Sequence, residues 1–175
     1  LTGTATASYT ENGAAIPLFS GITVTDVDDT DIVSASVSID ALGFISGDTL
    51  HFTDQSGITG SYDGATGLLT LTGTATLANY QAALRSITFS STSDDPTVNT
   101  TATSRTLHWT VTDANSDAAG TQSSADKTST LTVIPAQDSP LMTAGGTLNY
   151  TENAAAAVID ATVTVLSDAD DTQMA

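Results

Sequence analysis

Short runs in which apolar and polar residues alternate recur along the first 134 residues of the chain. A period of two, rich in Val, Ile and Thr, is typical of β-strands that bury one face. Turn-forming residues such as Gly, Pro, Asp and Asn separate the runs. The pattern predicts strands near residues 4–10, 21–25, 32–39, 49–53, 68–72, 86–91, 104–112 and 128–134.

One segment has a helical period instead. Thr76 is a suitable N-cap, and Leu77, Tyr80 and Leu84 follow at the spacing of one helix face. Asp63-Gly64, between two of the apolar runs, is a favourable tight-turn sequence. Seven or eight short strands with one short helix predict an all-β, Ig-like sandwich in which the helix is a crossover at one edge.

The sequence also contains an internal repeat. Tyr9-Thr10-Glu11-Asn12 recurs as Tyr150-Thr151-Glu152-Asn153. The acidic stretch Asp26-Val27-Asp28-Asp29-Thr30 recurs as Asp168-Ala169-Asp170-Asp171-Thr172, with one residue inserted before it. Similarity at a fixed offset indicates a tandem array of like domains.

A boundary between the copies can be read independently of the repeat. Pro135 and Pro140 bracket a short polar segment, which is typical of a fairly stiff linker. We therefore expect a complete repeat over residues 1–140. Residues 141–175 then hold the first two strands and the acidic loop of the next repeat, and the chain is expected to be a piece of a longer array.

Charge and composition narrow the possible partners. Three Lys and Arg residues against 20 Asp and Glu residues give a net charge of −17, which repels nucleic-acid phosphates and anionic headgroups. We therefore expect neither nucleic acid nor membrane insertion. Cysteine is absent, which excludes disulfides and Cys-ligated zinc, and bound metal ions are an alternative means of stabilisation.

Aspartates crowd one loop and recur in the second copy. Carboxylates this close in sequence repel one another unless a cation lies between them, and Ca²⁺ prefers six to eight oxygen ligands in irregular geometry. The glycine and glutamate that an EF-hand requires at its sixth and twelfth positions are missing, and a solvated acidic turn is the alternative interpretation. The aspartates are Asp26, Asp28, Asp29 and Asp31, then Asp168, Asp170 and Asp171.

Several motifs together resemble the bacterial cadherin-like repeats of very large secreted adhesins of the type I secretion, RTX-adhesin kind. They are the Tyr9–Asn12 motif, the Asp26–Asp29 loop, the segment from Tyr62 to Leu84, the strand ending in Trp109-Thr110-Val111-Thr112-Asp113, and the linker. The resemblance covers the first repeat and the start of the second. It implies a cadherin-like sandwich on the bacterial cell surface.

The resemblance also implies calcium between consecutive repeats. By position, a junction site would use Glu11, Asp94 or Asp95, Gln137 and Asp138 with Asp168 and Asp170, beside Asp171 of the same loop. A half-site at the other end of the first repeat would use Asp26 and Asp28, beside Asp29, with Asp113. The linker is poorer in Asp and Asn than that of cadherins, which leaves the number of ions open.

The sequence therefore predicts a calcium-binding module that rigidifies an extended array for cell-surface or biofilm adhesion, with neighbouring repeats as its partners. A carbohydrate-binding module for surface polysaccharide, and a packing unit of a surface layer or filament that binds copies of itself, are the alternatives. Isolated His51 and His108 are expected to be structural, and Trp109 to be a core aromatic. Because no Ser/His/Asp, phosphate-loop or zinc-protease motif is found, we expect no enzyme.

Overall fold

The structure is a computed structural model of residues 1–175. It describes every residue except 4, 116–117, 119, 161, 164 and 170–175, and at 165–167 it describes the backbone alone. The chain divides into two compact units, Leu1–Ala136 and Gln137–Ala175. Among the described residues, strands β1 to β9 and helix α1 belong to the first unit, and β10 and β11 to the second.

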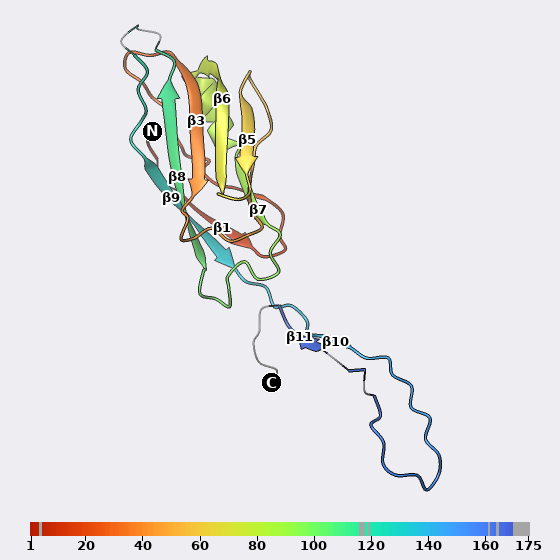
Figure 1. The fold of residues 1–175 in the computed structure, drawn as a ribbon. Helices are drawn as coiled ribbons and strands as arrows, with labels where there is room; N and C mark the ends of the chain where they lie inside the picture. The colour runs from red at the N-terminus through yellow and green to blue at the C-terminus, as the bar shows by residue number, and fades with distance from the viewer. Residues whose placement is uncertain (4, 116–117, 119, 161, 164, 170–175) are drawn as a thin grey trace. The chain divides into compact units, whose positions relative to one another are not determined.

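Two sheets form the first unit (Figure 1). The larger sheet has the order β1-β9-β8-β3-β6-β5, and the smaller has the order β2-β7-β4. Neighbouring strands are antiparallel except β1 and β9, which are parallel. The all-β sandwich is thereby confirmed. The strands are β1 Thr6–Thr10, β2 Ile16–Pro17, β3 Asp31–Ile39, β4 Asp48–His51, β5 Thr59–Asp63, β6 Leu68–Thr76, β7 Thr88–Ser91, β8 Ser104–Asp113 and β9 Lys127–Ile134.

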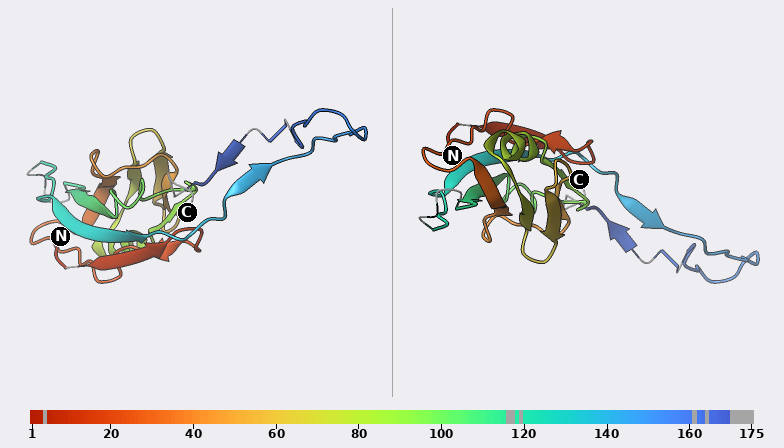
Figure 2. Two further views of the ribbon diagram at one scale, coloured as in Figure 1. Left: turned by 90° about the horizontal axis from the view of Figure 1, so that it is seen from below. Right: turned by 90° about the horizontal axis from the view of Figure 1, so that it is seen from above.

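The apolar positions of the alternating strands meet in one core, which the strands surround in the end-on views of Figure 2. Trp109 on β8 is completely buried, and its indole Nε1 donates a hydrogen bond to Ser129 Oγ at 2.8 Å. The Phe19 ring meets Trp109 edge-on, with centroids 5.4 Å apart. The expectation that Trp109 is a core aromatic is confirmed.

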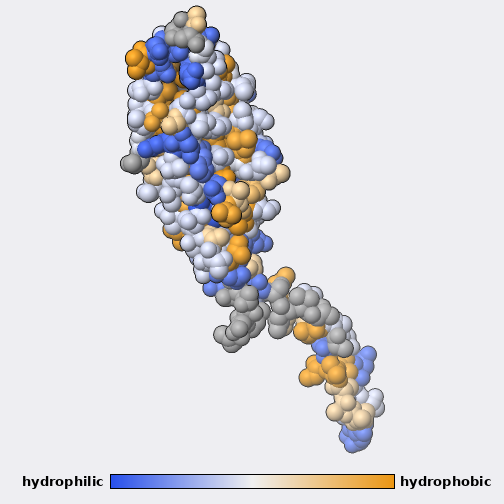
Figure 3. Space-filling model, turned by 60° about the vertical axis from the view of Figure 1, so that its left-hand side comes forward, coloured by the Kyte–Doolittle hydropathy of each residue, from blue (hydrophilic) through white to orange (hydrophobic). Residues whose placement is uncertain are grey.

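The outward positions of the larger sheet are mostly Thr and Ser. Ser36 and Thr110 on neighbouring strands share a hydrogen bond of 2.6 Å between their hydroxyls, as do Thr59 and Thr72 at 3.1 Å. Figure 3 shows weakly polar residues over much of the visible face of the first unit, with hydrophobic residues scattered among them and some groups of strongly hydrophilic ones. The alternation therefore separates an apolar interior from a surface rich in hydroxyl groups, with the ionisable His108, Asp40 and Asp126 at one place on it.

The helical crossover is also confirmed. Helix α1 spans Leu77–Arg85 and joins β6 of the larger sheet to β7 of the smaller. Thr76 caps it, because its Oγ1 accepts a hydrogen bond from Asn79 N at 3.3 Å. Tyr80 and Leu84 are buried on the inner face, and the Tyr80 hydroxyl donates to Gly73 O at 2.7 Å.

The predicted strand at residues 21–25 is wrong. Only a single bridge forms there, between Thr2 and Thr23. The alternation in this segment was genuine, since Ile22 and Val24 are both buried. They fill the core from a loop, where Val24 N donates to the side chain of Gln81 at 3.2 Å instead of to a neighbouring strand.

Two strands were not predicted. β2 has only two residues, too few for a periodic signal, and β5 contains Gly60 and mostly exposed residues. β5 is nevertheless paired with β6 through the predicted turn, where Asp63 Oδ1 accepts a hydrogen bond from Ala65 N at 2.9 Å. The turn residues therefore located the hairpin better than the strand pattern did.

The second unit contains β10, Leu141–Thr143, paired antiparallel with β11, Val165–Ser167. Its Thr151–Ala154 turn closes with a hydrogen bond of 3.0 Å from Ala154 N to Thr151 O, and the equivalent bond from Gly13 N to Thr10 O is 2.9 Å long. Asn12 and Asn153 both have positive φ, at 59° and 63°. The repeated sequence motif thus adopts the same local turn in both units.

Candidate metal centre

Strand directions place the candidate ligands of the first unit at its two opposite ends. β3 starts at Asp31, beside Asp113 where β8 ends. β1 and β9 both end at the opposite end of the larger sheet along the strand direction, near Glu11 (Figure 1). We call these the Asp26 end and the Glu11 end. Each acid-bearing loop follows or precedes a central strand, so the sheet fixes where its aspartates begin.

At the Asp26 end, the loop folds back on its first aspartate. Asp26 Oδ1 accepts hydrogen bonds from Asp29 N at 3.0 Å and from Asp28 N at 3.3 Å. This turn brings one carboxylate oxygen from each of the three aspartates within 4.8 Å of the others. Asp29 is buried, whereas Val27 and Asp28 are exposed, so only one carboxylate of the cluster is enclosed by the protein.

The same turn also affects the acidity of Asp26. The backbone hydrogen bond from Asp29, followed by that from Asp28, lowers the pKa of Asp26. Carboxylates so close together repel each other when ionised, and a cation between them offsets that repulsion. The donor set contains only oxygens and lies on an irregular loop, which fits a hard cation such as Ca²⁺.

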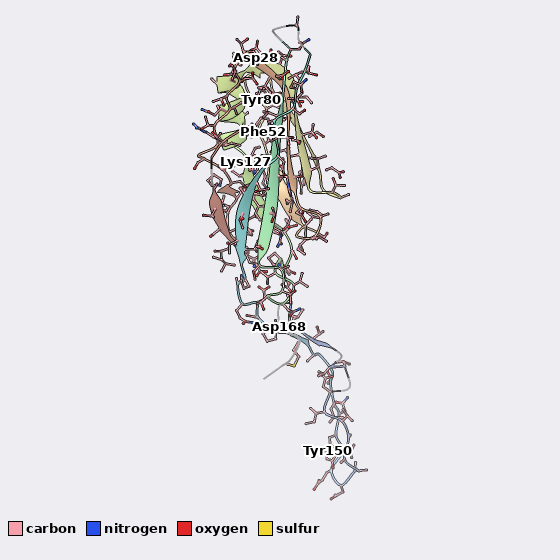
Figure 4. All side chains as sticks on the ribbon, turned by 90° about the vertical axis from the view of Figure 1, so that its left-hand side faces the viewer. Asp28, Phe52, Tyr80, Lys127, Tyr150 and Asp168 are labelled. Carbon is pink, nitrogen blue, oxygen red and sulfur yellow. The ribbon has the colours of Figure 1, made fainter. Side chains whose placement is uncertain are left out.

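Helix α1 contacts the loop that carries the aspartate cluster. Thr30 O accepts a hydrogen bond from Leu77 N, the first residue of α1, at 3.3 Å. Figure 4 shows Asp28 at the end of the sandwich, above Tyr80 of that helix. Ala114 N donates to Asp31 O at 3.0 Å, which ties the loop to the end of β8 as well.

Asp113 lies at the Asp26 end but outside the three-aspartate group. It is 5% exposed, and its two carboxylate oxygens accept hydrogen bonds from Gln122 N at 3.0 and 2.8 Å, with Asn115 N at 3.3 Å from Oδ1. In this position the carboxylate closes the loop between β8 and β9. The structure therefore brings Asp29, rather than Asp113, together with Asp26 and Asp28.

At the Glu11 end, the described candidates are Glu11, Asp94 and Asp95. Glu11 is buried, and its Oε2 accepts a hydrogen bond from Ala136 N at 2.8 Å, which ties β1 to the last residue of the unit. Asp94 is exposed. Asp95 accepts hydrogen bonds from Thr97 N at 3.2 Å and from Asn99 N at 2.8 Å within its own loop.

The remaining candidates belong to the second unit. Gln137 and Asp138 begin it, and the Gln137 amide donates to Asp138 O at 3.4 Å. Asp168 directly follows β11, one position beyond the pairing of Leu141 with Ser167, and so lies at the same end of that small ladder as Asp138. Asp170 and Asp171 lie outside the described residues.

A buried ion pair was missed by the sequence reasoning. Arg105 Nε lies 2.6 Å from Asp48 Oδ2, and both side chains are completely buried. Arg105 stands at an apolar position of the alternating β8 pattern, among only three Lys and Arg residues in the chain. A basic residue on the buried face of a strand was the available signal, because a charge there needs a partner.

No protein-family model matches the chain, and no curated protein matches it. In the part of the chain that the structure describes, no helix is long and apolar enough to cross a membrane.

Proposed function

We propose that the chain is a calcium-binding tandem-repeat module of an extracellular bacterial surface protein or adhesin. Calcium bound at the ends of each repeat would fix successive repeats relative to one another and stiffen the array. The proposal assigns a binding and mechanical role to the chain and no catalytic step.

The observation that carries this proposal is the grouping of Asp26, Asp28 and Asp29, whose carboxylate oxygens lie within 4.8 Å of one another at one end of the sandwich. Further acids lie at the opposite end, with Glu11 held against the last residue of the unit. Acids at both ends of a repeat are what a head-to-tail array with metal at its junctions requires. The recurrence of the Asp26 loop at Asp168 supports the same interpretation.

Two surface hollows of the first unit have a single ionisable residue, Asp40, between them. One, of about 480 Å³, is lined by residues of β1, β2 and the segment after β2, and none of its side chains ionises. The other, of about 450 Å³, contains Asp40 among Gly, Ala, Leu, Ser and Thr residues.

The mechanism proposed is thermodynamic linkage. A cation that binds only the folded repeat stabilises it by RT ln(1 + [L]/Kd), about 2.7 kcal/mol at a hundredfold excess over Kd. The ion also offsets repulsion among carboxylates in a chain of net charge −17. Folding and stiffness of the array would then both depend on external calcium.

The test is a thermal melt and small-angle scattering of the 175-residue chain in calcium and in chelator, at equal ionic strength. Calcium should raise the midpoint by roughly 5–10 °C, because 1 kcal/mol shifts a domain of this size by about 2–4 °C. It should also lengthen the particle. Magnesium at the same concentration should do less, since it accepts irregular geometry poorly.

Matched variants test whether the calcium-induced rise in melting temperature comes from the aspartate cluster. Replacing both Asp28 and Asp29 with Asn should remove most of the calcium-induced rise in melting temperature. The Asp54→Asn variant removes a charge from an exposed aspartate outside the cluster and keeps an acceptor for Gly60 N, so it should respond like the wild type. The proposal fails if chelation changes neither the melting temperature nor the particle dimensions of the wild type.

A further inference from the structure

The two sheets of the first unit end in four edge strands, β1 and β5 in the larger sheet and β2 and β4 in the smaller. Three of them carry a feature that opposes pairing with a further strand. β2 contains Pro17, which has no N–H group. In β5, Gly60 N donates to Asp54 Oδ1 at 3.0 Å, and in β4, Asp48 O accepts a hydrogen bond from the Tyr62 hydroxyl at 2.7 Å. Natural sheets protect their edges in such ways because an open edge pairs with other chains.

Strand β1 has no such protection among the described residues. The stretch Leu1–Thr10 contains neither a charged side chain nor a proline. In the parallel pairing of β1 with β9, Thr130 N donates to Ala5 O at 3.4 Å. Successive residues of a strand point their backbone groups to opposite sides, so those of Thr6 and Ser8 point away from β9. Both residues are exposed, and their N–H and C=O groups are open to a further strand.

An uncharged hollow lies beside this edge. It is the hollow of about 480 Å³ between β1 and β2, and its lining includes Ala5, Ala7, Ile16 and Leu18. When a peptide adds to a sheet edge, main-chain hydrogen bonds provide affinity and pockets for alternate side chains provide specificity. The edge of β1 and the hollow provide these two elements together.

The second unit carries exposed apolar side chains that need cover. Among the described residues, seven of the eleven large hydrophobic residues that are exposed belong to Gln137–Ala175. Every residue from Ser139 to Ile159 is exposed, and Figure 3 shows hydrophobic residues on the visible surface of this unit. Apolar residues that gather on a surface in this way mark an interaction site.

Within the second unit, Thr147–Thr151 is the segment that suits the edge of β1. The internal repeat matches it to Thr6–Thr10, which forms a strand in the first unit. Leu148 and Tyr150 are two residues apart, so both lie on one face when the segment is extended. No acidic or basic residue occurs between Ser139 and Thr151. The segment therefore brings two apolar side chains and no charge to an uncharged hollow, which matters in a chain of net charge −17.

We propose that the free edge of β1 binds the Thr147–Thr151 segment of a second copy of this chain as an added strand, with Leu148 and Tyr150 in the hollow. Replacement of β1 by the segment would expose as much strand as it covers, whereas addition forms new hydrogen bonds and loses none. The two surfaces differ, so the contact is head-to-tail and extends into a filament unless it closes into a ring. The inference goes beyond the proposed function and needs no metal ion.

The test combines sedimentation and amide hydrogen exchange of the 175-residue chain in chelator, from micromolar to millimolar concentration. The mean mass should rise with concentration. Amide exchange at Thr6 and Ser8 should slow in parallel, because an added strand covers these N–H groups. The Glu11 amide, which donates to Ile134 O at 2.9 Å, should keep its protection throughout, because β1 stays paired with β9.

Variants identify the two sides of the contact. Leu148→Ser should raise the dissociation constant of self-association by about tenfold, as expected for one leucine that is no longer buried. Leu42→Ser is the control, because Leu42 is 98% exposed in the first unit and should leave association unchanged. Ser8→Pro removes an N–H that points away from β9, where an edge strand accepts proline, and should also weaken association.

A synthetic peptide of residues 145–153 provides a measurement that does not depend on any variant. Added in excess, it should dissociate the assemblies and still slow amide exchange at Thr6 and Ser8, because it occupies the same edge. In Ser8→Pro, the protection of the Glu11 amide reports whether β1 is intact.

Four results would overturn the inference. The first is a mass that does not change with concentration, together with fast exchange at Thr6 and Ser8 in excess peptide. The second is an equal effect of Leu148→Ser and Leu42→Ser, which would indicate unspecific apolar contact. Loss of protection at the Glu11 amide on association would indicate that β1 is replaced and not extended. Association that requires calcium would assign the contact to metal sites.

Discussion

The few cationic side chains join segments that lie far apart in the sequence. Arg85 Nε, in the last turn of α1, donates to Ile22 O at 2.9 Å and so ties the helix to the loop before the aspartate cluster. Arg105 ties the β7–β8 loop to the interior. The chain has only three Lys and Arg residues against 20 Asp and Glu residues. Two of these three cationic residues therefore connect distant segments of the structure.

His108 makes a third connection of this kind. It stands on β8, with Nδ1 at 2.6 Å from Asp126 and Nε2 at 3.5 Å from Asp40. These acids precede β9 and follow β3, the two neighbours of β8 in the sheet. The hydrogen bond to Asp126 raises the pKa of His108 above its ordinary value of 6.5.

The sign of the resulting pH dependence follows from linkage. Because the folded pKa exceeds the unfolded one, this contribution to stability is complete below about pH 6.5 and is lost as the pH rises through the folded pKa. The His108 side chain is 34% exposed and those of Asp40 and Asp126 are 41% and 45% exposed, so the contribution is at most about 1 kcal/mol. In melts between pH 5.5 and 8.5, the difference between the wild type and His108→Gln should shrink as the pH rises. A difference that is constant with pH would contradict this assignment.

At the scale of elements, the period of the apolar residues predicted the long, regular strands and the helix. β3, β8 and β9 were predicted within one residue at each end, because a long alternation leaves little choice of face, even though a bulge between Ile32 and Ser34 interrupts it in β3. Helix α1 was predicted from its cap and its buried face. The segment at 21–25 has the same alternation but no neighbouring strand, and pairing is a tertiary property that the pattern does not contain.

The cap of α1 can be tested directly. Thr76→Ala removes the acceptor for Asn79 N, and the free energy of unfolding should fall by about 1 kcal/mol. Thr76→Ser keeps the hydroxyl and should cost much less. Urea unfolding of both variants gives the comparison, and equal losses would show that the methyl group of Thr76 matters rather than its capping oxygen.

Gly73 in β6 provides a sharper test of element geometry. Its φ is +124°, and a Cβ there would lie 2.2 Å from the carbonyl oxygen of Gly57 in the β4–β5 connection. Gly73→Ala therefore forces backbone to move, and we expect a loss of about 2–4 kcal/mol in unfolding free energy. A Cβ at Gly21 meets nothing within 4 Å. Gly21→Ala should change stability by less than about 0.5 kcal/mol, and similar losses in both variants would refute the steric argument.

At the scale of the whole molecule, the candidate site was predicted in part. The repeat identified the Asp26 loop, and the structure gathers three of its aspartates as that loop implied. The structure shows Asp95 accepting hydrogen bonds within its own loop and Asp94 exposed. This difference could not be predicted, since adjacent identical residues differ only in the direction that the loop gives them. Arg105 was missed because alternation alone suggests an apolar residue at its position.

Net charge makes a prediction for the whole chain. At −17, general repulsion and local repulsion at the aspartate cluster both oppose folding, but salt screens them differently. The Debye length is about 10 Å at 0.1 M and about 3 Å at 1 M ionic strength, so added NaCl weakens repulsion between distant exposed acids. In chelator, we therefore expect the melting temperature to rise steadily with NaCl.

Calcium added at constant ionic strength should raise the melting temperature further, because it binds at a site in addition to screening the repulsion between acidic residues. The variant with Asn at both Asp28 and Asp29 separates the two effects. It should keep the rise with NaCl, since it retains most of the charge, and lose most of the rise with calcium. If the variant instead loses both responses in proportion, the cluster is only one part of a diffuse charge effect, and calcium acts on the chain as a general counterion.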